Sequence, residues 1–463
     1  MGYVLEELYG EQASTIAVQL AYHFQAAGLV TKAVGYLLQA GNRAVQLSAT
    51  QEAITHFTRA LALLATLPKT SERNQQELPL QLVLGAQLAT TRGYAAPEVE
   101  AAFARAYELS QQVGKTPQLF PALFGLWRFY LTGAKHQTGR QVAEQCLALA
   151  EHLQDPALLQ QAYHALSFSL FCLGELVPAR RYLEQGIALY NSEQHHVLAY
   201  TYGTDPGVHS LSLLTHQLWF LGYPDQALAR SNQARNLAQE LAHPMSEAVS
   251  LAYATWLYQL RQEPSAVQTA AAATSALCTK HGIMLYLTVA TILQGWTMTG
   301  QEEAEAGIAQ IRRGLAGFQS TGAYIYRPYF LILLAEAYAN VGQAEEGLKV
   351  LDEASAMIDK GGERVYEAWV NQLKGELWLQ VETQAEAKAA ACFDRAIEIA
   401  QQQGAKLLEL RATISLARLW QKQSKSQAAR DMLAECYGWF TEGFDTVDLQ
   451  KARFLLNELE PKV

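Results

Sequence analysis

The side chains best suited to bind a metal ion cluster around one segment of the sequence. His195, His196 and His209 flank a stretch that contains Asp205, and His216 follows two helical turns after His209. Imidazole and carboxylate groups are common zinc ligands, so a metal could bind there if the segment folded back on itself. The alternative interpretation, which we favour, is that these are polar side chains of a loop and of the helix after it.

Other patterns that carry catalysis or bind cofactors are absent from the sequence. It contains no G-x-x-x-x-G-K-[ST], no strand-flanked G-x-G-x-x-G, no H-E-x-x-H and no G-x-S-x-G. The carboxylate pairs Glu302-Glu303 and Glu345-Glu346 follow turns and begin helices, where acidic side chains favour the helix dipole. The five cysteines are widely spaced without a CxxC pair, which argues against a disulfide framework or a cysteine zinc site. We therefore expect no enzymatic activity, no bound metal and no cofactor.

A recurring pattern of small and large residues predicts the elements that position these side chains. In its clearest copies a turn with a glycine precedes a helix that carries a small, a large and again a small residue, as in Ala179, Leu183 and Gly186. Offsets of four and three place the three residues on one helical face, and small residues let the next helix approach closely. Further clear copies are Ala33, Leu37, Ala40; Ala227, Ser231, Ala234; and Gly347, Leu351, Ala354.

This pattern is similar to the tetratricopeptide repeat, in which pairs of helices stack because no single pair can bury its apolar face. It predicts an all-α, tetratricopeptide-like α-solenoid of about eleven helix pairs, with a capping helix in the C-terminal segment DTVDLQKARFLLNEL. We expect a single solenoid over residues 1–463, with N-terminal units in 1–115, central units in 116–325 and C-terminal units in 326–463. Residues 190–209 depart from the pattern and are expected to form an extended loop.

Charge and hydropathy restrict the class of partner. The net charge of −9 argues against nucleic-acid binding, which needs a basic surface. Residues 281–301 contain no Asp, Glu, Lys or Arg and approach the length of a membrane span, but they also fit a helix of the repeat. The N-terminus lacks the apolar run of a signal peptide. These features predict a cytoplasmic protein that contacts neither nucleic acid nor a membrane.

The repeat register predicts a binding surface as well. In stacked helix pairs the first helices line the concave face, and residues one position after the small residue of each first helix, or six before it, point into that groove. Aromatic rings with acidic and basic groups among them suit a peptide, a sugar or a small aromatic ligand. The alternative is that several of these rings pack between repeats as core. The predicted groove residues are Arg128, His164, Phe168, His209, His216, Trp256, Trp296, Tyr329, Glu336, Trp369 and Glu376.

Several segments resemble one bacterial group more specifically than the generic repeat does. These segments are RGYAAPEVEAAFARAYELSQQVG, YGTDPGV, LGYPDQAL, GIAQIRRGL, TGAYIYRPYFLILLAEAY, LDEASAMIDKGGERVYEAW and YGWFTEGFDTVDLQKARFLL. They look like the C-terminal tetratricopeptide regions of multidomain signalling ATPases of STAND type, often described as class III adenylate or guanylate cyclases. In that family an N-terminal cyclase domain and an ATPase module precede the helical repeats, which are thought to sense a ligand or partner. The family's catalytic residues have no counterpart in this sequence.

The resemblance and the groove together give the main functional hypothesis. We expect a non-enzymatic scaffold that binds a protein, a peptide or a small-molecule effector through its concave face. The resemblance implies that it is the sensor or regulatory region of a signal-transduction ATPase or cyclase, with that module in cis or in trans. The alternative hypothesis is a metal-dependent enzyme centred on the segment between His195 and His209.

Overall fold

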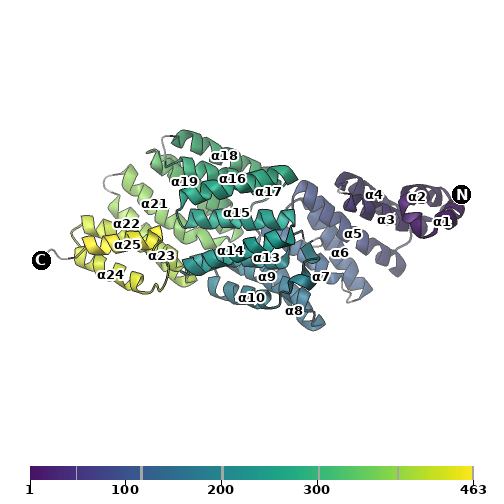
Figure 1. Ribbon diagram of the computed structural model, residues 1–463, viewed down its shortest axis with the longest axis horizontal. Coiled ribbons are helices and arrows are strands. Elements are labelled where there is room, and N and C mark those ends of the chain that lie inside the picture. The colour runs from purple at the N-terminus through teal and green to yellow at the C-terminus, as the bar shows by residue number, and fades with distance from the viewer. Residues whose placement is uncertain (48, 115–117, 200–202, 301–302, 383–384, 461–463) are drawn as a thin grey trace. The chain divides into compact units, whose positions relative to one another are not determined.

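The computed structural model describes residues 1–47, 49–114, 118–199, 203–300, 303–382 and 385–460 (Figure 1). Within these ranges the regular secondary structure is entirely helical and includes no strand. The predicted all-α class is therefore confirmed. Contacts between Cα atoms divide the chain into two compact units, of which unit 1 comprises Met1–Gly133 and Gln141–Leu149, and unit 2 comprises Ala134–Arg140 and Ala150–Val463. One continuous solenoid over 1–463 stays a prediction, because each unit is compact by itself.

Unit 1 consists of successive helices joined by short turns. Helix α8 (His136–Leu153) contributes residues to both units. The other helices of unit 1 are α1 (Gly2–Tyr9), the 3-10 helix η1 (Gly10–Ile16), α2 (Ala17–Ala26), α3 (Val30–Gln46), α4 (Thr50–Leu64), α5 (Ser71–Arg92), α6 (Pro97–Val113) and α7 (Leu119–Thr132).

Unit 2 continues the alternation of first and second helices. Its helices before the midpoint are α9 (Pro156–Cys172), α10 (Leu176–Ala188), α11 (Ser192–His195), α13 (Pro206–Phe220), α14 (Pro224–Leu241), α15 (Pro244–Leu260), α16 (Pro264–His281) and α17 (Met284–Met298). They are followed by α18 (Ala304–Ser320), α19 (Arg327–Asn340), α20 (Ala344–Gly361), the 3-10 helix η2 (Arg364–Tyr366), α21 (Glu367–Val381), α22 (Glu386–Gln403), α23 (Lys406–Lys422), α24 (Ser426–Gly438) and α25 (Val447–Glu458).

The small and large residues of the repeat pattern lie where the pattern predicts. Ala179, Leu183 and Gly186 of α10 are buried against the neighbouring helix, as are the equivalent residues of α14 and α20. Helices α17 and α18 approach closely: a Cβ added to Gly295 would lie 2.8 Å from the carbonyl oxygen of Gly307. The two helix backbones therefore touch, which only glycine permits. This packing and the likeness to solved structures given below confirm the tetratricopeptide-like solenoid.

Turn chemistry explains why each helix pair folds back so tightly. Gly174 and Gly222 end first helices with φ values of 80° and 92°, a left-handed region that side chains with a Cβ rarely adopt. Proline occupies the first turn of the next helix in several pairs, where its missing N–H costs no hydrogen bond. Examples are Pro224, Pro244 and Pro264.

Two details differ from the expected arrangement. Helix α4 carries a weaker copy of the pattern at Ala53, Phe57 and Ala60, and it directly follows α3, which carries the copy at Ala33, so that the two helices pack together as one pair. The segment 190–209 does not form an extended loop over its whole length, because it contains the short helix α11, and α13 already begins at Pro206. Asp205 accepts a hydrogen bond from the backbone N–H of Val208 and so fixes that start. Residues 200–202 lie outside the described ranges.

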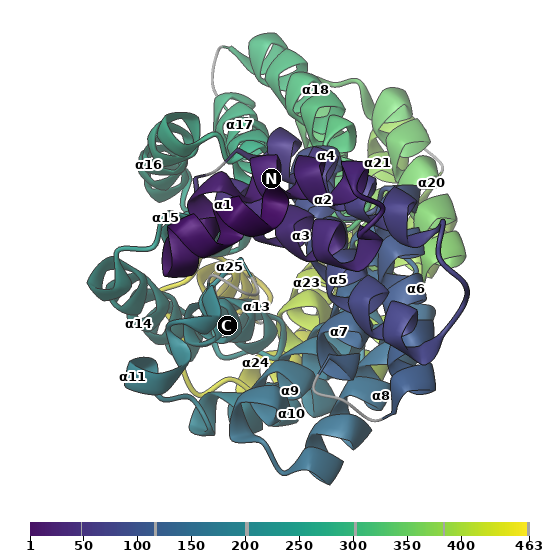
Figure 2. The same cartoon turned by 90° about the vertical axis from the view of Figure 1, so that its right-hand side faces the viewer.

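The helix pairs of unit 2 wind around a curve, so that helices far apart in the sequence meet (Figure 2). Helix α13 packs against α23, and the Arg411 guanidinium of α23 donates to the carbonyl oxygen of Leu260 at the end of α15. A second contact joins the start of α14 to the turn before α25, where the backbone N–H of Gly443 donates to Asp225. Helix α25 buries Leu449, Ala452 and Leu455, as the predicted capping helix should.

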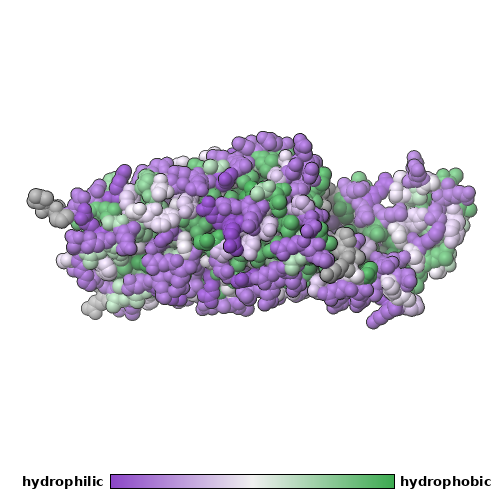
Figure 3. All heavy atoms as spheres, turned by 90° about the horizontal axis from the view of Figure 1, so that it is seen from below, coloured by the Kyte–Doolittle hydropathy of each residue, from purple (hydrophilic) through white to green (hydrophobic). Residues whose placement is uncertain are grey.

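The apolar stretch of residues 281–301 is accounted for by a repeat helix, α17, as far as the structure describes it. In the described part of the chain, no helix combines the length and the hydropathy needed to cross a bilayer. On the face shown in Figure 3, hydrophilic side chains predominate and apolar ones lie between them in small groups.

Candidate ligand-binding site

The predicted groove residues of unit 2 lie on one surface, which we call the inner wall: the groove residues of helices α9, α13, α15, α17, α19 and α21. On five of these helices the rings touch in succession. His164 of α9 lies 4.4 Å from His209 of α13, measured between ring centroids, and His216 of α13 lies 5.5 Å from Trp256 of α15. Side chains that share the same repeat position therefore lie in contact, although their helices are separated in the sequence.

The succession of rings continues into the second half of unit 2. Trp256 lies 5.8 Å from Tyr329 of α19, and Tyr329 lies 5.9 Å from Trp369 of α21. Trp256, Tyr329 and Trp369 are exposed by only 2%, 1% and 2%. This part of the inner wall is packed like a hydrophobic core, in agreement with the alternative interpretation of those positions.

Rings that the register did not predict complete this packing. Tyr326 lies 4.7 Å from Trp256 and 6.2 Å from Phe168, and its hydroxyl is 2.8 Å from that of Tyr253. Phe330 stacks on Trp256 with nearly parallel ring planes. Burial raises the pKa of the Tyr253 and Tyr326 hydroxyls well above their usual value, so both remain neutral.

His216 belongs to this packed part and is not a free polar group. Its Nε2 lies 3.2 Å from the carbonyl oxygen of Tyr253, and its ring stacks on the Tyr253 ring. Burial lowers the pKa of His216 to about 4, although the hydrogen bond to Tyr253 acts in the opposite direction. At neutral pH the imidazole is therefore uncharged and Nε2 donates to that carbonyl.

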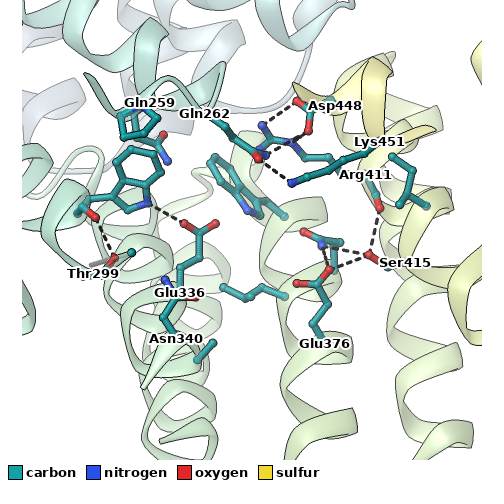
Figure 4. A pocket seen from close by; sticks show the side chains of 18 of the residues that line it. Gln259, Gln262, Thr299, Glu336, Asn340, Glu376, Arg411, Ser415, Asp448 and Lys451 are labelled. Carbon is teal, nitrogen blue, oxygen red and sulfur yellow. Dashed lines mark hydrogen bonds and ion pairs between the residues drawn. The ribbon is translucent and has the colours of Figure 1, made fainter. Parts of the chain in front are cut away.

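Next to the packed rings the inner wall opens into a pocket of about 490 Å³. Four predicted groove residues line it: Trp296, Trp369 and the two glutamates labelled in Figure 4, Glu336 and Glu376. The remaining lining is mostly polar and comes from α15, α16, α17, α19, α21, α23 and α25 and from the turns after α15 and α17. Its principal polar members are Gln259, Gln262, Asn340, Gln372, Arg411, Ser415, Asp448 and Lys451.

Glu336 is the carboxylate most affected by its surroundings. The indole N–H of Trp296 donates to Glu336 Oε2 at 3.1 Å. Burial raises the pKa of Glu336 to about 7, against the opposing effects of the Arg411 charge and of the Trp296 hydrogen bond, and the nearby Glu376 adds to the increase. Near neutral pH this carboxyl group is therefore shared between its protonated and charged forms.

Glu376 lies on the next first helix and points into the same space (Figure 4). Its Oε1 accepts hydrogen bonds from Gln372 at 2.7 Å and from the Ser415 hydroxyl at 2.8 Å. Burial raises the pKa of Glu376, partly offset by these two donors. Among the described residues neither Glu336 nor Glu376 forms an ion pair, so a cationic group of a ligand would complement both.

The two cations at the pocket make contacts within the protein. Arg411 forms a two-pronged pair with Asp448, with N–O distances of 3.0 and 2.9 Å, and stacks between Trp219 and Trp369. Lys451 donates to Gln262 Oε1 at 2.8 Å. Arg411 and Asp448 are both buried, and they join α23 and α25 to α13, α15 and α21.

Two groups of predicted residues lie apart from the pocket. Arg128 is in unit 1 on α7, where its guanidinium stacks 4.0 Å above the Tyr94 ring. In the histidine segment, His195 Nδ1 accepts from the backbone N–H of Asn191, and His196 Nδ1 contacts the Ser192 carbonyl. The one group of His, Cys, Asp and Glu in the described residues that is close enough to share a metal is His136, Cys172 and Glu363. It contains none of the predicted histidines.

Three of the pocket's charged residues were not predicted. Arg411 could have been, because it lies six positions before Ala417 of α23, which is the register used for the earlier first helices. Asp448 and Lys451 lie on the capping helix, to which the repeat register does not apply. Only the winding of unit 2 brings them to the pocket.

The comparisons with known proteins concern the fold. No family model matches the chain. A protein of Rhizobium meliloti (strain 1021), Uncharacterized protein R02095, is 25% identical over 405 residues, which are 86% of this chain. The chain spans 39% of the length of that relative.

Among solved structures, a Rap protein complexed with competence and sporulation factor is similar, with a TM-score of 0.59 at 10% identity. The match covers 80% of this chain and 98% of the Rap chain. The Cut9-Hcn1 hetero-tetramer of the APC/C matches 99% of this chain and 92% of its own with a TM-score of 0.39 at 12% identity. The chain thus shares its fold with helical-repeat proteins of the tetratricopeptide type.

Proposed function

We propose that this chain is a non-enzymatic binding scaffold that holds a peptide segment of a partner protein in the pocket of unit 2. The observation that supports this most is the pocket itself, in which two tryptophans and two carboxylates from successive first helices face one space of about 490 Å³. Concave sites with aromatic walls and a few converging polar groups are typical of ligand binding. The Rap protein of similar fold was crystallised in complex with another molecule, which is consistent with a binding role.

The chemistry of the pocket favours a basic ligand group. In the described part of the chain, Glu336 and Glu376 accept hydrogen bonds from neutral donors alone, whereas Arg411 pairs with Asp448. A lysine or arginine side chain of a peptide, or its terminal amine, would form charge-assisted hydrogen bonds with these carboxylates. Trp296, which is half-buried, can add a cation–π contribution of roughly 0.5–2 kcal/mol if the cation lies over its ring face.

We also propose that the scaffold acts as the sensor region of a signal-transduction ATPase or cyclase. The resemblance of the segments from RGYAAPEVEAAF to YGWFTEGFDTVDL supports this, as does a relative considerably longer than the matched region. The test is to read the coding sequence upstream of Met1. A nucleotide-binding module in the same reading frame or in the adjoining gene would support the proposal, and genes unrelated to signalling would contradict it.

A peptide array tests the binding proposal directly. The protein is incubated with a library of random peptides, and sequences enriched in basic residues are expected among those retained. Peptides selected in this way are then titrated against the Trp296→Ala and Glu376→Gln variants. The readout is the loss of the binding signal, which is either the change in tryptophan fluorescence or the heat measured by calorimetry. Glu345→Gln, which changes an exposed glutamate of α20, is the matched control. Unchanged affinity in both pocket variants would show that the pocket does not bind the peptide.

A further inference from the structure

Three side chains from distant parts of the chain converge at a second place in unit 2, away from the ligand pocket. His136 is the first residue of α8, Cys172 is the last residue of α9, and Glu363 precedes the short helix η2. One potential ligand atom from each lies within 4.8 Å of the other two. His136 and Cys172 are exposed by 0% and Glu363 by 1%. A nitrogen, a sulfur and a carboxylate oxygen therefore meet in a fully buried space.

The hydrogen bonding of this cluster is incomplete. Neither ring nitrogen of His136 has a hydrogen-bond partner among the residues that the structure describes, although polar atoms buried this deeply are almost always paired. The distance of 3.7 Å between His136 Nε2 and Glu363 Oε2 is too long for a hydrogen bond. Both carboxylate oxygens of Glu363 accept from the backbone N–H of Tyr326. Among the described residues, no cationic side chain forms a hydrogen bond with this carboxylate. One positive ion between the three groups would bind one atom of each, including one of the two His136 ring nitrogens.

We propose that His136, Cys172 and Glu363 bind one divalent transition-metal ion of the zinc class. Imidazole nitrogen, thiolate and carboxylate are the ligands that zinc takes in proteins, at about 2.0–2.3 Å. Ligand atoms at such distances stand roughly 3.3–3.8 Å apart in a tetrahedral site. The 3.7 Å between His136 Nε2 and Glu363 Oε2 already falls in that range, and all the ligand atoms lie within 4.8 Å of one another. Two anionic ligands balance the charge of the ion.

Metal binding changes the protonation of the cluster. Burial and the charge of Glu363 raise the pKa of the Cys172 thiol well above its usual value, so without a metal the thiol keeps its proton. On binding, the S–H proton passes to solvent and the thiolate sulfur donates its electron pair to the ion. The fourth coordination position remains for the second Glu363 oxygen or for a water molecule.

The position of the cluster gives the metal a structural role. It joins the start of α8 and the end of α9 to the turn between α20 and α21, where the backbones are already close: a Cβ added to Gly361 would lie 2.8 Å from the carbonyl oxygen of Ala134. Glu363 also holds Tyr326 in a left-handed conformation with φ of 66°, and Tyr326 is part of the packed inner wall. A bound metal would therefore stabilise the winding of unit 2.

Metal analysis of the full chain, prepared without a histidine tag, tests this proposal. After equilibration with Zn²⁺ and removal of free metal, we expect about one zinc per chain. Replacement with Co²⁺ should give thiolate-to-cobalt charge-transfer absorption together with the visible bands of a tetrahedral site. Cys172→Ala and His136→Asn should lose the zinc, and a chelator should lower the melting temperature of the wild type but not that of Cys172→Ala.

Cys278→Ala is the matched control, because Cys278 of α16 is equally buried in unit 2 but packs against Ala248 and Ile283. This variant should keep both the zinc and the cobalt spectrum. If Cys172→Ala fails to fold, the cobalt spectrum of His136→Asn decides, since a site built on another cysteine, such as the partly buried Cys392 or Cys436, would keep the charge-transfer band in that variant. Absence of stoichiometric zinc, or bound cobalt without that band, would overturn the proposal and leave His136 and Glu363 as a buried pair.

Discussion

Two parts of the inner wall carry the same kinds of side chain at the same repeat positions, yet they differ in burial. Trp256 of α15 is enclosed by His216, Tyr253 and Tyr326. Trp296 occupies the equivalent position one helix pair later, is half-buried and borders the pocket. The register thus determines that a side chain points toward the middle of the winding. The other side chains that reach the middle of the winding determine whether that side chain is buried as core or lines a site.

The difference has an identifiable physical origin. At the packed end, the turn before α19 places the Tyr326 ring between Phe168 and Trp256. At the open end the corresponding space is bordered by Glu336, Glu376 and the Arg411–Asp448 pair, whose charges need solvent or partners and cannot be covered by apolar rings. Polar groups therefore keep this part of the wall accessible.

The largest effect on this comparison is expected from Arg411→Ala. It leaves the Asp448 carboxylate buried without its cation and the Leu260 carbonyl without a donor, so we expect the free energy of unfolding to fall by about 4–5 kcal/mol. Urea denaturation followed by circular dichroism measures this loss. Arg418→Ala is the control, because Arg418 lies two turns later on α23 and is exposed. A loss below about 1 kcal/mol would show that the pair does not hold the open end together.

Trp256→Ala tests the packed end. Removing a buried indole creates a cavity, and we expect the free energy of unfolding to fall by about 3–4 kcal/mol. Trp256→Phe should cost much less, because the indole N–H of Trp256 finds no hydrogen-bond partner within the described ranges and the flat ring still fills most of the space. Equal and small losses in both variants would mean that Trp256 is not core. The measurement is the same denaturation experiment.

Trp296→Ala should separate binding from stability. We expect a loss of about 1–2 kcal/mol in the free energy of unfolding, because the ring is only half-buried, but a decrease of roughly tenfold or more in affinity for a selected basic peptide. Calorimetric titration of that peptide measures the affinity. A variant as unstable as Trp256→Ala, with unchanged affinity, would make the two parts of the wall equivalent.

The smallest expected effect is a pH dependence set by Glu336. A cationic ligand prefers the charged carboxylate, so affinity should rise by about tenfold between pH 6 and pH 8 as Glu336 ionises near its pKa of about 7. Without ligand the sign is opposite: the folded state holds this proton more tightly than the unfolded chain does. Its contribution to stability is therefore present at low pH and is lost as the pH rises from about 4.5 to 7. Both trends should be absent in Glu336→Gln.

The sequence was sufficient for the fold because the repeat is a local pattern. Ala179, Leu183 and Gly186 are three residues of one helix, and the physics that packs them acts between adjacent helices. The same register found Trp296, Glu336 and Glu376, and extended to α23 it would have found Arg411.

The remaining features of the site depend on how the helix pairs of unit 2 wind, which no local sequence pattern encodes. Tyr326 enters the inner wall from a turn and in a left-handed conformation. Asp448 reaches Arg411 because the capping helix returns to the end of α15. His136, Cys172 and Glu363 are far apart in the sequence, so no local spacing predicts their cluster, whereas the histidines around residue 195 are neighbours and do suggest a site.

The contacts of α23 and of the turn before α25 with α14 and α15 limit how many repeats unit 2 can have and how it can unfold. In an ordinary repeat array each unit touches only its neighbours, so units can be gained or lost and the ends can unravel separately. In unit 2, Arg411 reaches Leu260 and Asp225 reaches Gly443 across several helix pairs. Deleting or inserting one pair between them would pull these partners out of reach. The number of repeats in this stretch is therefore fixed by geometry, and the stretch should lose its structure in a single cooperative step.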